Sequence, residues 1–352
     1  MKVLIINTVS YTLNGISNVI VSSVENLKKI DSSIQISLTK SNGIDESYQK
    51  RLNGLVEYID IPRRKKVFKY IKALKKISSN YDVIHVHGNS ATMTLELMAF
   101  FGCRSRVVMH GHTTQCTHKI LHKILQPFFC KFTLNKAACS KDAGNFLYGK
   151  KDKTFKVLPN GIESDKFKFN YKYREELRKE YSLESNIVFL HVGLFNDVKN
   201  QEFLIKCFTL MKNDKYKLVF IGDGPNRKYL EDSISEDMKG KILFLGPKAD
   251  VYKYYSMADV FLLPSLYESF GIVLLEAQTN GLPSIASEFV SKSSLMDSEL
   301  VEYLPLKEEL WIDATARQRL RKQSVENIGL FDVYNVNEIL LEYYRSILKE
   351  SE

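Results

Sequence analysis

The sequence has 352 residues, enough for two domains, and a formal net charge of +9. No apolar run reaches the roughly 18 residues of a membrane-spanning helix, and the first strand-like run is too short for the apolar part of a signal peptide. The five cysteines form no Cys-x-x-Cys pair, which argues against a disulfide framework and a zinc ribbon. These features predict a globular protein with reduced thiols in the cytoplasm.

The charge is distributed unevenly. Residues 1–170 hold 27 Lys and Arg against 12 Asp and Glu, whereas residues 171–352 hold 23 against 29. This difference predicts two domains with separate partners. A basic half suits nucleic acid, an anionic membrane or an acidic ligand. Because the chain has no recognisable nucleic-acid motif or aromatic ladder, we expect no nucleic-acid partner.

Short apolar runs alternate with longer amphipathic stretches in the first half, which predicts parallel α/β structure. The expected strands are 2–8, 34–38, 56–61, 82–87, 106–110, 136–140 and 154–158. Gly15 stands between the first strand and a helix near 16–29. A single glycine at this position is more typical of a plain turn than of a phosphate-binding loop.

Two segments of the first half are basic and amphipathic. Arg63–Ser79 carries eight basic residues and no acid, and places Val67, Ile71, Leu74 and Ser78 on one helical face. A solvated surface helix and a helix lying on anionic lipid both remain open. Lys119–Phe132 is a second segment of this kind, for which core packing and membrane contact are again the alternatives.

Histidines gather at two strand ends. His85 and His87 lie on one face of the strand 82–87, at the carboxyl end where open α/β sheets bind ligands. No third metal ligand has a clear spacing, so a hydrogen-bonding or core role is favoured over a metal site. His110 ends the next strand and His112 follows it, where a histidine can act as a general base.

The second half repeats the alternation. Strands are expected at 187–192, 218–221, 242–245 and 260–263, with an amphipathic helix over 333–348. Lys199 stands just before a helix that begins near Asn200, where a lysine is suited to a phosphate. Lys248 lies in the loop after 242–245.

Two glutamates follow the strand 260–263. Glu268 lies in a loop, Phe270 and Gly271 open a helix, and Glu276 lies among its apolar residues. Eight helical steps span about 12 Å, which is too far for the carboxyl pair of a glycosidase. The two could instead hold the ends of one long ligand whose phosphates meet the free N–H groups of the helix start. A nucleotide sugar has this layout.

This stretch resembles the donor site of glycosyltransferase family 4, retaining GT-B enzymes with two glutamates at this spacing. The family's usual Glu-Gly-Phe-Gly reads Glu268-Ser269-Phe270-Gly271 here. The resemblance covers nearly the whole chain and is strongest over 258–286, 218–225 and 157–162. It implies two facing Rossmann-like domains, each a doubly wound, mostly parallel sheet, over 1–165 and 166–330. Residues 331–352 would form a helix returning to the first domain.

The resemblance also implies roles for single residues. The catalytic residues would be Glu268, which bonds the transferred sugar, and His110, which faces it, with His112 as the rival. The substrate-binding residues would be Gly15, Lys199, Asn200, Lys248, Ser269, Phe270, Gly271, Ile272 and Glu276, the last holding the ribose. The arginine that usually shares the diphosphate with the lysine is Leu194 here. Donor affinity is then reduced, or another cation substitutes.

The resemblance is greatest to the capsule and exopolysaccharide branch of the family. It implies retaining transfer of a hexose or N-acetylhexosamine from a nucleotide-diphosphate sugar, UDP-linked by expectation, to a lipid-linked saccharide. No metal and no cofactor are expected. The protein would lie in the cytoplasm, in peripheral contact with the anionic inner face of the cell membrane. The alternative is a catalytically weak nucleotide-sugar-binding protein of the same fold.

Overall fold

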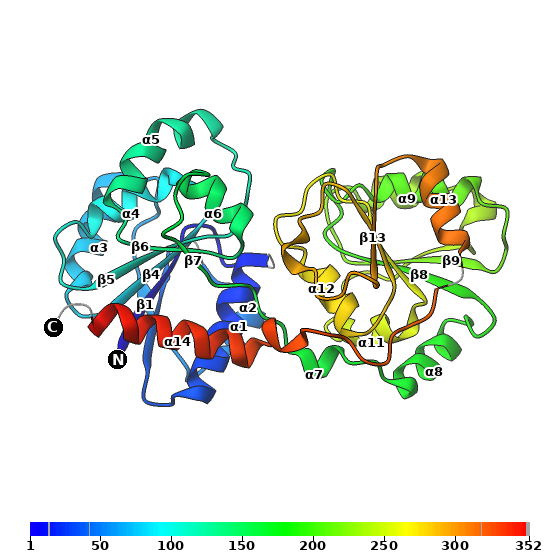
Figure 1. Cartoon of the computed structure of the whole chain (residues 1–352), viewed down its shortest axis with the longest axis horizontal. Coiled ribbons are helices and arrows are strands. Elements are labelled where there is room, and N and C mark those ends of the chain that lie inside the picture. Colours follow the sequence, from blue (N-terminus) through cyan, green and yellow to red (C-terminus); the bar gives the residue numbers. More distant parts are fainter. Residues whose placement is uncertain (13–14, 42, 318, 350–352) are drawn as a thin grey trace. The chain divides into compact units, whose positions relative to one another are not determined.

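A computed structural model describes residues 1–12, 15–41, 43–317 and 319–349 (Figure 1). The chain divides into two compact units, one formed by Met1–Gly161 with Leu330–Glu352 and the other by Ile162–Gly329. No helix among the described residues has the length and apolarity needed to cross a bilayer.

The first unit is built on a parallel sheet of the order β3-β2-β1-β4-β5-β6-β7. Its strands are β1 (Lys2–Asn7), β2 (Gln35–Lys40), β3 (Glu57–Asp60), β4 (Val83–Gly88), β5 (Arg106–Gly111), β6 (Asn135–Ala138) and β7 (Lys156–Val157). Its α-helices are α1 (Gly15–Ile30), α2 (Glu46–Arg51), α3 (Val67–Ser78), α4 (Thr94–Ala99), α5 (Lys119–Phe132), α6 (Lys141–Tyr148) and α14 (Val333–Lys349).

Both faces of this sheet are covered, as the uninterrupted apolar run of β1 requires. Val3 and Ile5 pack on one side against α1 and α14. Leu4 and Ile6 face the opposite core, to which α3, α4, α5 and α6 contribute. The last helix therefore belongs to the core of the first unit, where it supplies Leu340, Leu341, Tyr344 and Ile347.

The second unit has a parallel sheet of the order β10-β9-β8-β11-β12-β13. Its strands are β8 (Ile187–Val192), β9 (Tyr216–Ile221), β10 (Ile242–Phe244), β11 (Val260–Leu263), β12 (Ser284–Ser287) and β13 (Val301–Leu304). Its α-helices are α7 (Ser164–Phe167), α8 (Tyr171–Glu180), α9 (Gln201–Leu210), α10 (Arg227–Ser233), α11 (Val251–Met257), α12 (Ile272–Thr279) and α13 (Glu308–Ala316).

A charged clamp fixes the strand that leads to the two glutamates. Asp259, just before β11, forms ion pairs with Arg174 and Arg178 of α8. The same carboxylate accepts a hydrogen bond from the N–H of Val188 in β8, at 2.8 Å. Because both arginines come from one helix, the clamp holds α8, β8 and the start of β11 in register. The loop after β11 therefore begins from a rigid position.

The mostly parallel, doubly wound sheets expected from the sequence are confirmed, but the packing of α3 differs from the prediction. Tyr70, Leu74 and Ser78 are its buried residues, whereas Phe68 is 90% exposed. Arg64 is not part of a free basic surface, because its guanidinium pairs with the buried carboxylate of Glu96 at 2.8 Å. The tyrosine hydroxyl also donates to that carboxylate, at 2.8 Å, so the polar Tyr70 faces inward.

Candidate functional site

A glycine shapes the loop between β11 and α12. Gly271 has φ +77° and caps the helix, which begins at Ile272, two residues later than the sequence predicted. A side chain at this position would adopt a strained backbone, and its Cβ would lie 3.4 Å from Glu268 Cγ and from Ser294 Oγ. The first bonds of α12 run from the N–H groups of Leu274 and Leu275 to the carbonyl of Gly271, so the two N–H groups before them lie ahead of the hydrogen-bonded turn. They form a weakly positive site beside Glu268.

Glu268 is held from both its backbone and its side chain. Its carbonyl accepts a hydrogen bond from the N–H of Ser291 at 2.9 Å. Its carboxylate forms an ion pair with Lys199, and the two side chains are only 19% and 18% exposed. Lys199 comes from the loop between β8 and α9, where Asn196 Oδ1 accepts its N–H at 3.0 Å. The structure thus joins two residues that are 69 positions apart in the sequence.

Asn200 links the same two loops. It adopts the left-handed conformation, φ 55°, which asparagine tolerates better than most residues. Its side-chain amide donates to the carbonyl of Pro264 at 3.2 Å. That amide therefore fixes the lysine loop against the end of β11, which is a positioning role in this structure.

Glu276 lies one helical turn beyond the start of α12. Its carboxylate accepts a 2.5 Å hydrogen bond from the hydroxyl of Tyr255 in α11. Burial raises the pKa of Glu276 to about 7, although the tyrosine bond opposes this rise. Near neutral pH both protonation forms are therefore populated. Ionised Glu276 is a strong acceptor that keeps capacity for a further donor such as a ribose hydroxyl.

His191 is a residue that the sequence analysis missed. It is fully buried in β8, and its Nδ1–H donates to the carbonyl of Leu262 at 2.8 Å. Burial, aided by the nearby charge of Lys199 and opposed by the bond to Leu262, lowers the pKa of His191 to about 4, so the ring is neutral and Nε2 is an acceptor. Among the described residues Nε2 has no hydrogen-bond partner. The sequence did contain a signal for it, because His191 is the one polar residue of the strand 187–192, and Gly193 follows that strand.

The other residues predicted to bind the donor differ in their exposure and contacts. Phe270 is buried, and Ser269 and Ile272 are partly exposed on either side of the helix start. Lys248, after β10, places its ammonium 5.7 Å from the ring centre of Tyr254. Leu194 is 51% exposed, so the position of the usual arginine carries an open apolar side chain.

The loops after β8 and β9 touch each other. Gly222, with φ +133°, lies so close to the neighbouring loop that a Cβ would stand 2.0 Å from the carbonyl oxygen of Gly193. Only a glycine allows this approach. Gly222 therefore holds the turn after β9 against the loop after β8.

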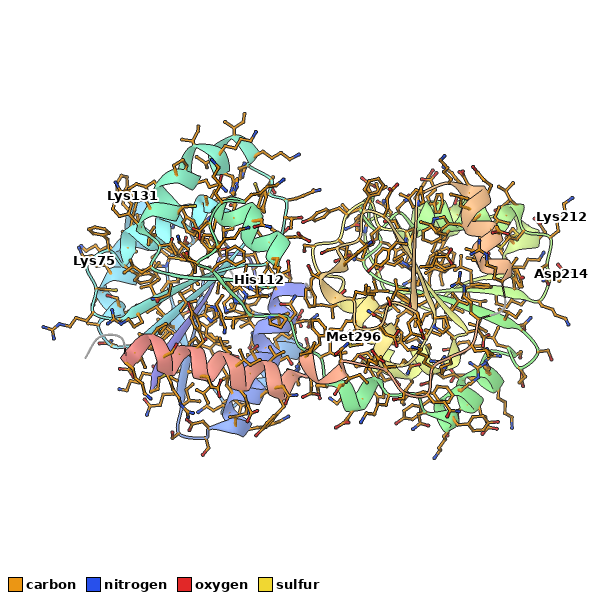
Figure 2. The ribbon with its side chains drawn as sticks, in the orientation of Figure 1. Lys75, His112, Lys131, Lys212, Asp214 and Met296 are labelled. Carbon is orange, nitrogen blue, oxygen red and sulfur yellow. The ribbon has the colours of Figure 1, made fainter. Side chains whose placement is uncertain are left out.

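In the first unit, β4 and β5 bring four histidines together. His85 Nε2 lies 3.1 Å from His110 Nδ1, and His87 Nδ1 lies 2.8 Å from His112 Nε2. All four are buried; His112 is labelled in Figure 2. Burial lowers the pKa of His85, His87 and His110 well below the ordinary value and that of His112 to about 4, so the rings are neutral. The hydroxyl of Tyr344 in α14 lies 2.6 Å from His85 Nδ1.

The two rivals are alike in that each ring meets one group outside the histidine cluster. The backbone of Leu158 raises the pKa of His110, and the side chain of Asn160 raises that of His112, each against the larger effect of burial. His87, His110 and His85 also offer nitrogens within 4.8 Å of one another, close enough to approach one metal ion. The sequence analysis saw no third ligand with a clear spacing beside His85 and His87; the pairing of β4 with β5 brings His110 to them. Gly15, by contrast, is exposed at the start of α1, and a Cβ there would meet nothing within 4 Å.

Comparison with known proteins agrees with this geometry. Residues 173–294 match the family model Glycosyl transferases group 1. The putative glycosyltransferase EpsF of Bacillus subtilis is 28% identical over 298 residues, which are 78% of each chain. The capsular polysaccharide biosynthesis glycosyltransferase CapH of Staphylococcus aureus is 25% identical over 83% of this chain and 84% of its own.

Two further matches name a ligand or substrate. The Escherichia coli UDP-Gal:alpha-D-GlcNAc-diphosphoundecaprenol alpha-1,3-galactosyltransferase is 29% identical over 68% of this chain and 66% of its own. The crystal structure of Anabaena HepE in complex with UDP superposes with a TM-score of 0.80 at 18% identity, covering 98% of this chain and all of HepE. At that identity the superposition establishes the fold.

The two Rossmann-like units and the donor-type loop define a protein of the GT-B fold, as the sequence predicted. The chain carries a group 1 glycosyltransferase domain, and its relatives are glycosyltransferases that include a capsular one. The expected resemblance to group 1 glycosyltransferases is thereby confirmed.

Proposed function

We propose that this chain is a retaining glycosyltransferase that moves a sugar from a UDP-sugar to a lipid-linked saccharide during capsule or exopolysaccharide synthesis. The observation that carries the proposal is the Lys199–Glu268 ion pair at the start of α12, with Glu276 on the same helix. Glu276 lies four helical steps after Ile272, which is about 6 Å along the helix. This length suits a phosphate at the helix start and a ribose further along.

The ion pair has a simple role in such a site. Without donor, Lys199 and Glu268 satisfy each other's buried charge. When a donor binds, Lys199 turns to the diphosphate, next to the N–H groups of α12, and Glu268 accepts a sugar hydroxyl. The positive groups stabilise the negative charge that develops on the leaving diphosphate. His191 Nε2, a neutral buried acceptor near Lys199, helps to orient that ammonium.

The neutral histidines of the first unit are suited to bind a sugar. His110 is uncharged, so its ring can exchange a hydrogen bond with a sugar hydroxyl. His85 and Tyr344 hold its ring through the bonded chain described above. We propose transfer without a metal, because Lys199 and the helix start supply the charge that a divalent ion would otherwise supply.

The lipid-linked acceptor is proposed from the diphosphoundecaprenol substrate that the E. coli relative's name contains. Peripheral contact with an anionic membrane would then rest on the basic first unit. In α3 and the turn before it, the basic residues Arg63, Lys65, Lys66, Lys69, Lys72, Lys75 and Lys76 are exposed. The eighth basic residue, Arg64, forms an ion pair with the buried Glu96, so it should be excluded from any test of lipid contact.

The test is UDP release by purified protein from a panel of UDP-sugars, with and without undecaprenyl diphosphate-linked saccharides. Acceptor-dependent release is expected with at least one pair, and NMR of the product should show the anomeric configuration of the donor. Glu268→Gln should abolish transfer, while Glu288→Gln, which changes an exposed carboxylate of the same unit, should not. Inversion of configuration would refute the retaining mechanism.

One observation favours the second candidate, a catalytically weak nucleotide-sugar-binding protein. Leu194 occupies the place of the family's arginine and leaves the diphosphate one cation fewer. Calorimetry with UDP and UDP-sugars, run beside the release assay, separates the two. Tight UDP-sugar binding without release to any acceptor or to water would support the binding protein over the enzyme.

A further inference from the structure

An apolar pocket opens on the first unit, away from the residues discussed so far. Its volume is about 300 Å³, and it lies between the end of α4, the amino ends of β5 and β6, and the end of α5. Its walls include Leu97, Phe100, Val107, Met109 and Phe132. A concave apolar site of this size is large enough to enclose part of a small hydrophobic ligand.

The mouth of the pocket is also apolar and faces solvent. Phe101 is 66% exposed and Leu134 is 85% exposed, and both line the pocket. The neighbouring α5 continues this surface, since Ile120 and Ile124 on its outer side are 79% and 68% exposed. Apolar side chains gathered around a pocket mark a contact site for a hydrophobic partner.

Positive charge accompanies this apolar surface. Arg106 and Lys131 line the pocket, and no acidic residue does so within the described chain. Figure 2 shows Lys131 at the outer side of α5. Lys119 and Lys123 extend the charge along α5, which contains no Asp or Glu. The partner that matches this combination has an apolar part and an anionic group.

We propose that the pocket takes one hydrocarbon chain of an anionic phospholipid, whose headgroup meets Arg106 and Lys131. A bilayer lipid is preferred to the glycosyl acceptor because of the pocket's place in the sheet. Arg106 begins β5 and His110 lies four residues further, about 13 Å along the strand. The saccharide of an acceptor has to reach that carboxyl end, whereas an anchoring lipid does not. This lipid site rests on the proposed function only for the membrane contact, and lipid binding needs no transfer activity.

Cys103 provides a probe inside the pocket. It lines the pocket and is partly exposed, and burial raises the pKa of its thiol. Cys116, before α5, is also partly exposed, does not line the pocket, and serves as the control thiol. Peptide mass spectrometry after maleimide labelling measures each thiol separately in the intact chain.

We expect phosphatidylglycerol vesicles to slow labelling of Cys103 at least fivefold relative to Cys116, and phosphatidylcholine vesicles to have little effect. Monomeric dihexanoyl-phosphatidylglycerol should protect Cys103 saturably, whereas glycerol phosphate, the headgroup without chains, should not. Protection by glycerol phosphate would reduce the site to an anion site and overturn the proposal. Failure of the monomeric lipid to protect would also overturn it. Lipid-free protection that grows with protein concentration would identify a second copy of the chain as the occupant instead.

Variants test the pocket without threatening the fold. Leu134→Ser and Phe101→Ser change exposed side chains at the mouth and should weaken protection of Cys103 by phosphatidylglycerol at least fivefold. Leu320→Ser, at a 78% exposed position of the second unit, is the matched control and should not. Binding of UDP should be equal in all three. If phosphatidylglycerol protects Cys103 normally in the mouth variants, the pocket is refuted. If the parent protein shows this protection but no UDP-sugar transfer, only the proposed function is refuted.

Discussion

Replacing Glu276 by glutamine should affect stability and ligand binding in opposite directions. In the unfolded chain this carboxyl ionises with its ordinary pKa of 4.5, whereas burial in the folded chain raises the pKa to about 7. Folding therefore disfavours the ionised form, and stability falls as the pH rises from about 4.5 to about 7. Above that range the loss is complete and amounts to about 3 kcal/mol. Glutamine has the same shape and no charge to bury.

Glu276→Gln should therefore be more stable than the parent protein above neutral pH, by up to about 3 kcal/mol, and no more stable at pH 4. If the carboxylate holds the ribose, the same change removes a charge-assisted hydrogen bond of about 1.5–3 kcal/mol. UDP affinity should then fall by roughly one to two orders of magnitude. The difference in affinity between the two proteins should grow as the pH rises through about 7, because only ionised Glu276 makes this bond.

Urea unfolding at several pH values measures the first effect, and isothermal calorimetry with UDP measures the second. Glu288→Gln removes an exposed carboxylate of the same unit and should change neither quantity appreciably. A folded Glu276→Gln protein with the parent's UDP affinity would show that this residue does not hold the ribose. A variant with no added stability at high pH would refute the argument from burial.

Three further predictions concern other residues. Leu194→Arg should tighten UDP binding about tenfold by restoring a charged phosphate contact; no gain in a folded variant would mean that the loop binds the diphosphate differently. Arg64→Gln should cost about 3 kcal/mol in urea unfolding because it leaves the buried Glu96 unpaired, whereas Lys65→Gln should change stability by less than about 0.5 kcal/mol; equal losses would contradict the buried pair. Transfer should persist in EDTA, and loss of activity that a divalent ion restores would contradict the metal-free mechanism.

The sequence predicted the parallel sheets because each buried strand is a short apolar run between turns, and local composition determines that pattern. It also predicted that Glu268 and Glu276 lie on one loop–helix unit, since the helix brings nearby positions into a known spacing. Gly271 marked the helix start for the same local reason. These features depend on residues that are close to each other in the sequence.

Features that depend on distant residues were not predictable in this way. The pairing of Lys199 with Glu268 and of Tyr255 with Glu276 requires β8, α11 and α12 to be placed first. The inner face of α3 was misjudged because Tyr70 is polar by composition, yet its hydroxyl is satisfied by Glu96 from α4. His191 was overlooked because nothing in its strand indicates that Leu262 would accept its ring N–H.

The return of α14 to the first unit has a consequence for the order of synthesis. Leu341 and Tyr344 are fully or almost fully buried in a core that otherwise comes from residues 3–158. The ribosome completes all of residues 162–329 before it reaches them. During translation the second unit is therefore free to fold as a finished piece, while in the first unit the side of the sheet that carries α1 stays partly uncovered. On a stalled ribosome that has synthesised residues 1–329, the earlier half of the chain should be the one that proteases digest and chaperones hold.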